Sequence, residues 1–149
     1  VAARLQRDVL EHARAFSDYP MIDLYCGAGF FTLPLAKEHG WAMGIELVNG
    51  AIKNAKRAAL EQNINADFIV GDVFDEVDLV KRKIGDASPF LVVDPARRGL
   101  EVGVVEELDA MNPVAIAYVS CHPKSLARDL AAFQALGWTV EDSKVYDMF

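Results

Sequence analysis

Short apolar runs alternate with longer amphipathic segments along nearly the whole chain. The apolar runs predict strands at residues 21–25, 41–47, 66–70, 90–93, 114–120 and 139–146. Helical spacing of apolar residues predicts helices at residues 1–15, 32–39, 48–62, 74–83, 102–111 and 125–136. Strands that alternate with helices need crossover connections, which are right-handed and place helices on both faces of the sheet. The sequence therefore predicts an α/β fold with a doubly wound, mostly parallel sheet.

The length and the cysteine content narrow the class of protein. A chain of 149 residues suits a single domain, and we expect one domain over residues 1–149, excised from a longer chain because it begins with Val1 and stops after an apolar-rich segment. The two cysteines, Cys26 and Cys121, come without CxxC or HxxxH spacing, so we expect neither a disulfide framework nor a metal site. No apolar stretch approaches the roughly 20 residues that cross a bilayer, and no secretion signal is visible, which predicts a cytoplasmic location with no membrane partner.

The net charge of −7 argues against a strong grip on a phosphate backbone by this chain alone, because that grip requires Lys and Arg residues that displace counterions. We therefore expect the chain by itself to bind nucleic acid weakly.

The first predicted strand ends in the sequence DLYCGAGFF, with Asp23 inside the strand and Gly27 and Gly29 in the turn that follows. Glycine adopts positive φ angles and lets a ligand approach the backbone closely. Glu46 ends the next strand, where a carboxylate can accept both hydroxyl hydrogens of a ribose. Gly27, Gly29 and Glu46 together predict a cofactor site, with a tight structural turn as the alternative.

A dehydrogenase would also carry such a turn, but the sequence departs from the dinucleotide fingerprint, because Thr32 stands at the third glycine position of GxGxxG. The sequence DLxCGxG instead resembles the class I S-adenosylmethionine-dependent methyltransferases, a Rossmann-like class. This resemblance implies that the glycine turn faces the methionine end of the cofactor and that Glu46 holds the ribose. We also expect Asp23, inside the first strand, to be one of the cofactor-binding residues. Asp72, after the third strand, would contact the adenine amino group, or else cap the next helix.

The fourth predicted strand ends in the sequence LVVDPARRG. An unpaired buried carboxylate is costly, so Asp94 at the tip of this apolar strand has either a ligand-binding role or a capping role. We expect it to contact a substrate base or the cofactor. Arg97 and Arg98 follow it, as partners of Asp94, of a phosphate, or of solvent.

The fifth predicted strand ends in YVSCHP, which places Cys121 at the edge of the sheet where ligands bind in this fold. Amides at the start of the following helix stabilise a thiolate. Cys121 is therefore the candidate nucleophile, with His122 beside it. Cys26, inside the glycine turn, is expected to be a buried structural thiol.

The motifs DLYCGAGFFTLPLA, GIE, VVDPARRG and YVSCHPKSLARDL together resemble the catalytic domain of the RNA uracil-5-methyltransferases, from about Asp23 to the final DMF segment. The resemblance implies methyl transfer from S-adenosylmethionine to carbon 5 of a uridine in ribosomal or transfer RNA. Cys121 would add to carbon 6 of the uracil, and Asp94 would contact the base.

Three departures from that family bear on activity. His122 stands where an asparagine is expected after the cysteine. The glutamate that acts as the base in the family would follow the DMF segment, beyond Phe149, and so would the last strand of the sheet. We therefore expect little or no methylation by this chain alone, and an exposed or newly paired sheet edge.

Two other functions stay open. A non-catalytic module with this fold would bind a nucleotide or a protein partner, which the acidic charge and the missing base favour. A methyltransferase that acts on an exocyclic base nitrogen would carry an N/D-P-P-Y/F tetrapeptide after the fourth strand, and DPAR lacks its aromatic residue.

Overall fold

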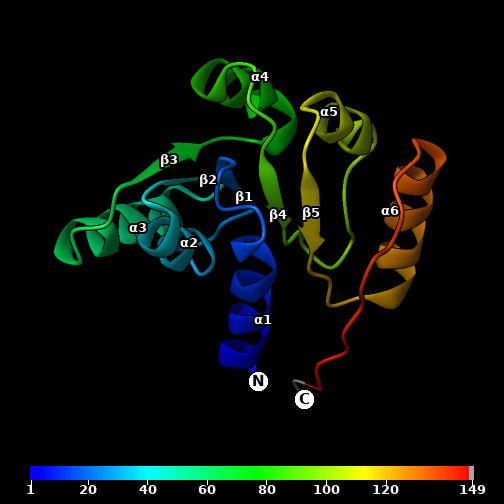
Figure 1. Ribbon diagram of the computed structural model, residues 1–149, viewed down its shortest axis with the longest axis horizontal. Coiled ribbons are helices and arrows are strands. Elements are labelled where there is room, and N and C mark those ends of the chain that lie inside the picture. Colours follow the sequence, from blue (N-terminus) through cyan, green and yellow to red (C-terminus); the bar gives the residue numbers. More distant parts are fainter. Residues whose placement is uncertain (148–149) are drawn as a thin grey trace.

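The computed structural model describes residues 1–147, which form one five-stranded parallel sheet with helices on both faces (Figure 1). The strands are β1 (Met21–Leu24), β2 (Ala42–Glu46), β3 (Ala66–Val70), β4 (Phe90–Val93) and β5 (Ala115–Tyr118). The helices are α1 (Ala2–Arg14), α2 (Thr32–His39), α3 (Asn49–Glu61), α4 (Val73–Ile84), α5 (Val104–Ala110) and α6 (Pro123–Ala135). The prediction of a doubly wound α/β fold is confirmed.

The strand order β3-β2-β1-β4-β5 reverses direction at β1, which pairs with β2 on one side and with β4 on the other. The crossover from β1 to β2 and the crossover from β4 to β5 run in opposite directions along the sheet, so the loops that follow β1 and β4 diverge. In open parallel sheets this switch point, at the carboxyl ends of the strands, is where ligands bind.

Alternate residues of each central strand pack on opposite faces of the sheet. Ile22 and Leu24 of β1 belong to a core cluster with α4, α5 and α6, whereas Met21 packs in a second cluster with α1 and α2. The third helix on that second side, α3, buries Ile52, Ala55 and Ala59. Figure 1 shows this division, with α1, α2 and α3 on one side and α4, α5 and α6 on the other. Because both faces are covered, β1 and β4 are buried at every position.

The sixth strand predicted at residues 139–146 is wrong. Residues 139–147 form no strand, because no neighbouring strand lies beside them to complete a ladder. The segment instead runs back past α6 toward α1 (Figure 1). There the Tyr146 hydroxyl donates to Asp8, and Lys144 forms an ion pair with the same carboxylate. Met148 and Phe149 of the DMF segment lie outside the described residues.

The other predicted elements are present, with shifts at their ends. The fifth strand ends at Tyr118 rather than at residue 120, and α6 begins at Pro123 rather than near residue 125. The earlier start of α6 reflects its cap: His122 precedes Pro123, and its Nδ1 accepts the N–H of Ser125 at 3.3 Å. Within residues 1–147, no helix combines the length and the apolar character needed to span a membrane.

Candidate functional site

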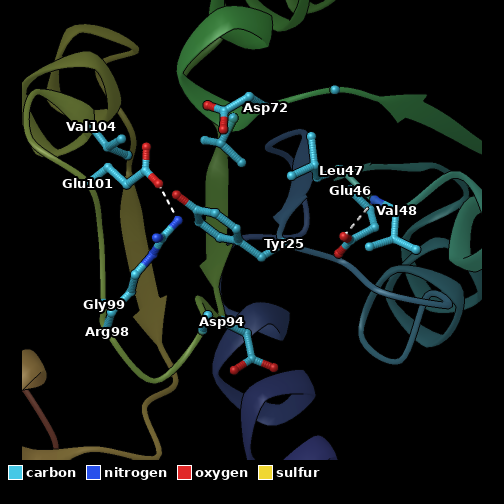
Figure 2. A pocket seen from close by; sticks show the side chains of 13 residues that line it. Tyr25, Glu46, Leu47, Val48, Asp72, Asp94, Arg98, Gly99, Glu101 and Val104 are labelled. Atoms are coloured by element: carbon cyan, nitrogen blue, oxygen red, sulfur yellow. Dashed lines mark hydrogen bonds and ion pairs between the residues drawn. The ribbon is translucent and has the colours of Figure 1, made fainter.

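A cavity of about 260 Å³ opens at the carboxyl ends of β1, β2, β3 and β4 (Figure 2). Three of the residues predicted for the site line it together: Glu46 at the end of β2, Asp72 after β3 and Asp94 after β4. Figure 2 shows Asp72 and Asp94 at opposite ends of the cavity, with Glu46 on a third side. The strand ends thus bring these distant carboxylates into one site, as the sequence predicted.

Glu46 is held by the backbone on both sides of it. Its Oε2 accepts the N–H of Gly27 at 3.0 Å, and its Oε1 accepts the N–H of Val48 at 3.0 Å. Each carboxylate oxygen can accept more than one hydrogen bond, so the anchored group keeps acceptor capacity toward the cavity. This geometry suits a ligand with two neighbouring hydroxyl groups.

The glycine turn after β1 needs glycine for two different reasons. Both Gly27 and Gly29 have positive φ, at 54° and 89°. A Cβ on Gly29 would lie 3.0 Å from the Leu33 side chain, so this residue permits close packing of the turn on α2. A Cβ on Gly27 would meet no atom within 4 Å, which leaves open space beside the backbone of the turn. Gly27 therefore lies where a ligand can reach the backbone, and Gly29 has a packing role.

Tyr25, which the sequence analysis did not identify, lies in the middle of the cavity (Figure 2). Its φ of 64° is uncommon for a residue with a bulky side chain, and such strained residues gather at functional sites. Burial raises the pKa of its hydroxyl, with further contributions from nearby acids such as Asp72 and Glu101. The side chain therefore stays a neutral hydroxyl that can donate a hydrogen bond to a ligand.

Asp72 has the capping role that the sequence left as its alternative. Its Oδ1 accepts the N–H of Phe74 at 2.9 Å and so caps α4. The residue still lines the cavity. Capping occupies one carboxylate oxygen, and the second remains an acceptor for a ligand amino group.

Asp94 is half-buried at the end of β4, and its carboxylate has no hydrogen bond or ion pair with residues 1–147. Burial raises its pKa to about 6. A desolvated, unpaired carboxylate at the edge of a cavity is typical of a ligand contact. The predicted capping alternative is therefore wrong for Asp94.

Asp23 was predicted among the cofactor-binding residues, but neither Asp23 nor Cys26 lines the cavity. Asp23 is fully buried, and its Oδ2 accepts the Thr32 hydroxyl at 2.6 Å, while Oδ1 has no partner. Burial raises the pKa of Asp23 to about 7 and also raises that of the Cys26 thiol. Cys26 packs against Gly44, where an added Cβ would come within 2.6 Å of the sulfur. The prediction of a buried structural thiol at position 26 is confirmed.

Cys121 lies outside the cavity and is exposed, three residues after the end of β5 and directly before His122. The Ser120 hydroxyl closes this short loop, since it accepts the N–H of His122 and donates to the carbonyl of the same residue, both at 3.1 Å. The structure thus separates the predicted nucleophile from the three cavity carboxylates, but keeps it at the same end of the sheet.

The sequence analysis missed several residues of the cavity besides Tyr25. Leu47 and Val48 line it as largely exposed apolar side chains. Arg98, for which the sequence left Asp94, a phosphate or solvent as partners, instead forms an ion pair with Glu101 at the cavity (Figure 2). Leu47 and Val48 follow Glu46 directly, and an apolar pair after an acidic strand end is a signal that could have identified them. Nothing in the sequence indicates the positive φ of Tyr25.

Comparison with known proteins places this geometry in a family. A family model described as "Methyltransferase domain" matches residues 15–87, which include the glycine turn, Glu46 and Asp72. The chain carries a methyltransferase domain. Over 146 residues it is 39% identical to an uncharacterized RNA methyltransferase of Clostridium tetani, and over 149 residues 40% identical to one of Caldanaerobacter subterraneus subsp. tengcongensis. The matches cover 97% and 99% of this chain and 32% of each relative. The methyltransferase domain therefore spans about a third of the length of these relatives.

Solved structures agree with this assignment. The domain superposes on the Pyrococcus abyssi tRNA (uracil-54, C5)-methyltransferase in complex with S-adenosyl-L-homocysteine, with a TM-score of 0.64 and 30% identity over 83% of this chain and 31% of that one. Precorrin 8w decarboxylase of Methanobacterium thermoautotrophicum shares the fold alone, with a TM-score of 0.63 and 19% identity over 81% of this chain and 64% of that one. The comparisons indicate S-adenosylmethionine as the cofactor of the methyltransferase domain.

Proposed function

We propose that this methyltransferase domain takes part in RNA methylation, with transfer of a methyl group from S-adenosylmethionine to carbon 5 of a uridine in ribosomal or transfer RNA through a covalent adduct at Cys121. The observation that carries the proposal is an exposed cysteine at the same end of the sheet as the cavity lined by Glu46, Asp72 and Asp94. The 30% identity to a tRNA uracil-C5-methyltransferase supports it.

The residues present fit the cofactor. Glu46, fixed by two backbone amides, would accept the ribose hydroxyls, and the open space beside Gly27 admits a ligand to the turn. Asp72 would accept the adenine amino group, and the exposed Leu47 and Val48 give the ring apolar surface. Bound there, S-adenosylmethionine supplies the methyl group that carbon 5 of the uracil accepts.

Cys121 and Asp94 would act on the uracil ring. The thiolate sulfur of Cys121 forms a bond to carbon 6, and the electron pair of the C5–C6 double bond moves toward carbon 5, which becomes nucleophilic. After methylation, loss of the carbon 5 proton to a base returns that electron pair, the C6–S bond breaks, and the thiolate is released. Asp94, whose pKa burial raises to about 6, would form a hydrogen bond with the polar edge of the ring. The family resemblance implies that a glutamate beyond Phe149 would serve as the base.

The charge distribution near Cys121 supports an RNA substrate despite the net charge of −7. Segments 95–100 and 119–138 hold Arg97, Arg98, Lys124 and Arg128 and a single acid, the buried Asp129. The exposed side chains of Arg97 and Lys124 have no ion pair or hydrogen bond with residues 1–147, so they are available to phosphate groups. The expectation of weak RNA binding was drawn from the net charge of the whole chain. This basic face is where RNA would bind.

Covalent trapping tests the proposal directly. RNA that contains 5-fluorouridine has fluorine in place of the departing proton, so the adduct cannot be resolved after methylation. With S-adenosylmethionine, the protein at its full natural length should form an adduct that survives denaturing electrophoresis. Cys121→Ala should form no adduct, and Cys26→Ala should still form one.

Binding of S-adenosyl-L-homocysteine, measured by calorimetry, separates the enzyme from a non-catalytic module. Cofactor binding without any adduct in the wild-type protein would exclude Cys121 from the chemistry and favour the module or a methyltransferase with another target atom. Absence of both would contradict the proposed function as a whole.

A further inference from the structure

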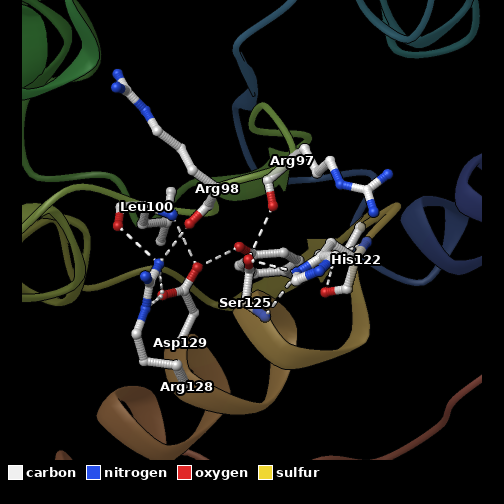
Figure 3. A network of polar contacts seen from close by, with 9 residues as sticks. Arg97, Arg98, Leu100, His122, Ser125, Arg128 and Asp129 are labelled. Carbon is white, nitrogen blue, oxygen red and sulfur yellow. Dashed lines mark hydrogen bonds and ion pairs between the residues drawn. The ribbon is translucent and has the colours of Figure 1, made fainter.

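The loop after β4 and the first half of α6 are joined by a network of polar contacts centred on Asp129 (Figure 3). Asp129 is only 3% exposed. Its Oδ2 accepts the backbone N–H of Leu100 at 2.8 Å and the Tyr118 hydroxyl at 2.5 Å. One carboxylate therefore holds the last residue of β5, a loop residue after β4, and its own helix together.

Arg128 completes the network from the solvent side. Its Nε and Nη2 donate to Oδ1 of Asp129 at 3.0 and 2.9 Å, which compensates the buried charge. The same Nη2 donates to the carbonyls of Arg98 at 2.8 Å and Leu100 at 3.0 Å. The loop backbone is thus held at an N–H and at two carbonyls by one pair of adjacent side chains.

A second link lies closer to Cys121. The Ser125 hydroxyl donates to the carbonyl of Arg97 at 2.8 Å, and Nδ1 of His122 lies 2.9 Å from the same hydroxyl. His122 directly follows Cys121, and Arg97 is three residues after Asp94. Each of the two groups proposed to act on the uracil is therefore within three residues of an anchored atom.

Gly99 shows that the contact between loop and helix is tight. It has a φ of 79°, and a Cβ there would lie 2.5 Å from Oδ2 of Asp129 and 2.6 Å from Arg128. The loop backbone can approach α6 this closely only because position 99 has no side chain.

We propose that Asp129 is a positioning residue that fixes the separation between the Asp94 carboxylate and the Cys121 sulfur by locking the loop after β4 onto α6. This inference rests on the proposed function, because it assigns both groups to the same uracil ring. Neither group lies on a strand or helix: Asp94 is just past β4 and Cys121 is in the loop before α6. A displacement of about 1 Å from the reactive geometry can reduce a rate by about 100-fold, so loops with this task need a rigid connection.

The test measures adduct formation with 5-fluorouridine RNA in the full-length protein as a function of RNA concentration. Asp129→Ala should lower the maximal rate about 10- to 100-fold and leave half-saturation by RNA within about 3-fold. Asp129→Asn should recover part of the rate, because its amide oxygen can still accept the N–H of Leu100. Affinity for S-adenosyl-L-homocysteine should change less than the maximal rate in Asp129→Asn, since Glu46 and Asp72, the residues proposed to hold the cofactor, lie at the ends of β2 and β3 and not on this loop.

Asp109 provides a matched control. Its Oδ1 accepts the indole N–H of Trp138 at 2.9 Å and so joins α5 to the segment after α6, and its side chain forms no hydrogen bond with segments 95–100 or 119–125. Asp109→Asn should leave the maximal rate unchanged even if it lowers thermal stability. A loss in Asp109→Asn as large as that in Asp129→Asn would reduce Asp129 to an ordinary structural residue and overturn the proposal.

Amide hydrogen exchange separates failure of this inference from failure of the proposed function. In Asp129→Asn, segments 95–100 and 119–125 should lose protection together, and in Asp109→Asn neither should. If the wild-type protein forms no adduct, the proposed function fails, and the exchange data still decide whether Asp129 couples the two loops. Loss of protection in only one segment, or in neither, contradicts the inference.

Discussion

The backbone N–H of Gly27 donates a 3.0 Å hydrogen bond to Oε2 of Glu46, which joins the turn after β1 to the end of β2. With the second bond from Val48, this contact fixes the carboxylate before any ligand arrives. A group already in place binds more tightly than one that must be ordered on binding. The glycine turn and the acid are therefore one unit, although 19 positions separate them in the sequence.

We predict that Glu46→Ala weakens binding of S-adenosyl-L-homocysteine about 10- to 100-fold, because a hydrogen bond to a charged group contributes about 1.5–3 kcal/mol. Isothermal titration calorimetry measures this affinity. Glu38→Ala is the control, since Glu38 pairs with Arg14 at the far end of α2 and should bind the cofactor normally. Equal affinities in the two variants would contradict the cofactor role of Glu46.

The two cysteines should differ strongly in reactivity toward a disulfide reagent. Cys121 is exposed, whereas Cys26 is buried and its burial raises the pKa of the thiol. The native protein should therefore react rapidly at one thiol, and denaturation should expose a second thiol to the reagent. Absorbance of the thiolate that leaves the reagent reports both phases. Cys121→Ala should remove the fast phase and Cys26→Ala the slow one; the reverse assignment would contradict the structure.

His122 should stabilise α6 through its cap. We predict that His122→Ala lowers the free energy of unfolding by about 1 kcal/mol, while His122→Asn retains it, because asparagine is also a good N-cap. Urea denaturation measures the difference. His12→Ala provides the comparison, since His12 forms only an exposed ion pair with Asp142 and should cost less. If His122→Ala leaves the free energy of unfolding unchanged, the cap does not contribute to stability.

Asp23 should make stability depend on pH. Burial raises its pKa to about 7, above the value of about 3.9 in an unfolded chain, so the folded state holds this proton more tightly. The contribution of this protonated carboxyl to the free energy of unfolding is fully present below pH 4. It is lost as the pH rises through 7, and the free energy of unfolding then falls by up to about 4 kcal/mol. Asp23→Asn should flatten that dependence between pH 4 and 8 in denaturation curves. An unchanged profile would mean that Asp23 titrates normally.

Arg97 and Lys124 should contribute to RNA affinity. Replacing both with alanine should weaken binding of single-stranded RNA, and the slope of log affinity against log salt should decrease by about 0.7 for each lost phosphate contact. Fluorescence anisotropy over a salt series measures this slope. The double variant Lys53→Ala, Lys56→Ala removes the same charge from the exposed face of α3 and should leave the slope unchanged. Similar slopes in the two double variants would rule out a local contact.

The central strands and the cavity carboxylates could be predicted because their signals are local. The run FLVVD gives both β4 and Asp94: apolar residues at every position indicate a strand buried on both faces, and parallel strands place their ends at one edge. The same reasoning located Glu46 at the end of β2 and Asp72 after β3. Cys26 was recognised as structural because cysteine is commonly buried.

The remaining features depend on partners that are distant in the sequence. Residues 139–146 have the composition of a strand, but a strand forms only beside a neighbour that accepts its hydrogen bonds, and none lies there within residues 1–147. The φ of Tyr25 is set by the turn and not by the preferences of tyrosine. The burial of Asp129 likewise depends on Leu100, 29 positions away.

The return of residues 139–147 to α1 has a consequence for how this domain can be handled. Tyr146 and Lys144 contact Asp8, so the two ends of the described chain lie side by side (Figure 1). A short linker could connect them without deforming the sheet, and the backbone could then be cut in an exposed loop elsewhere. The same proximity lets residues 1–147 be inserted as a unit into a surface loop of a host protein, with both junctions close together.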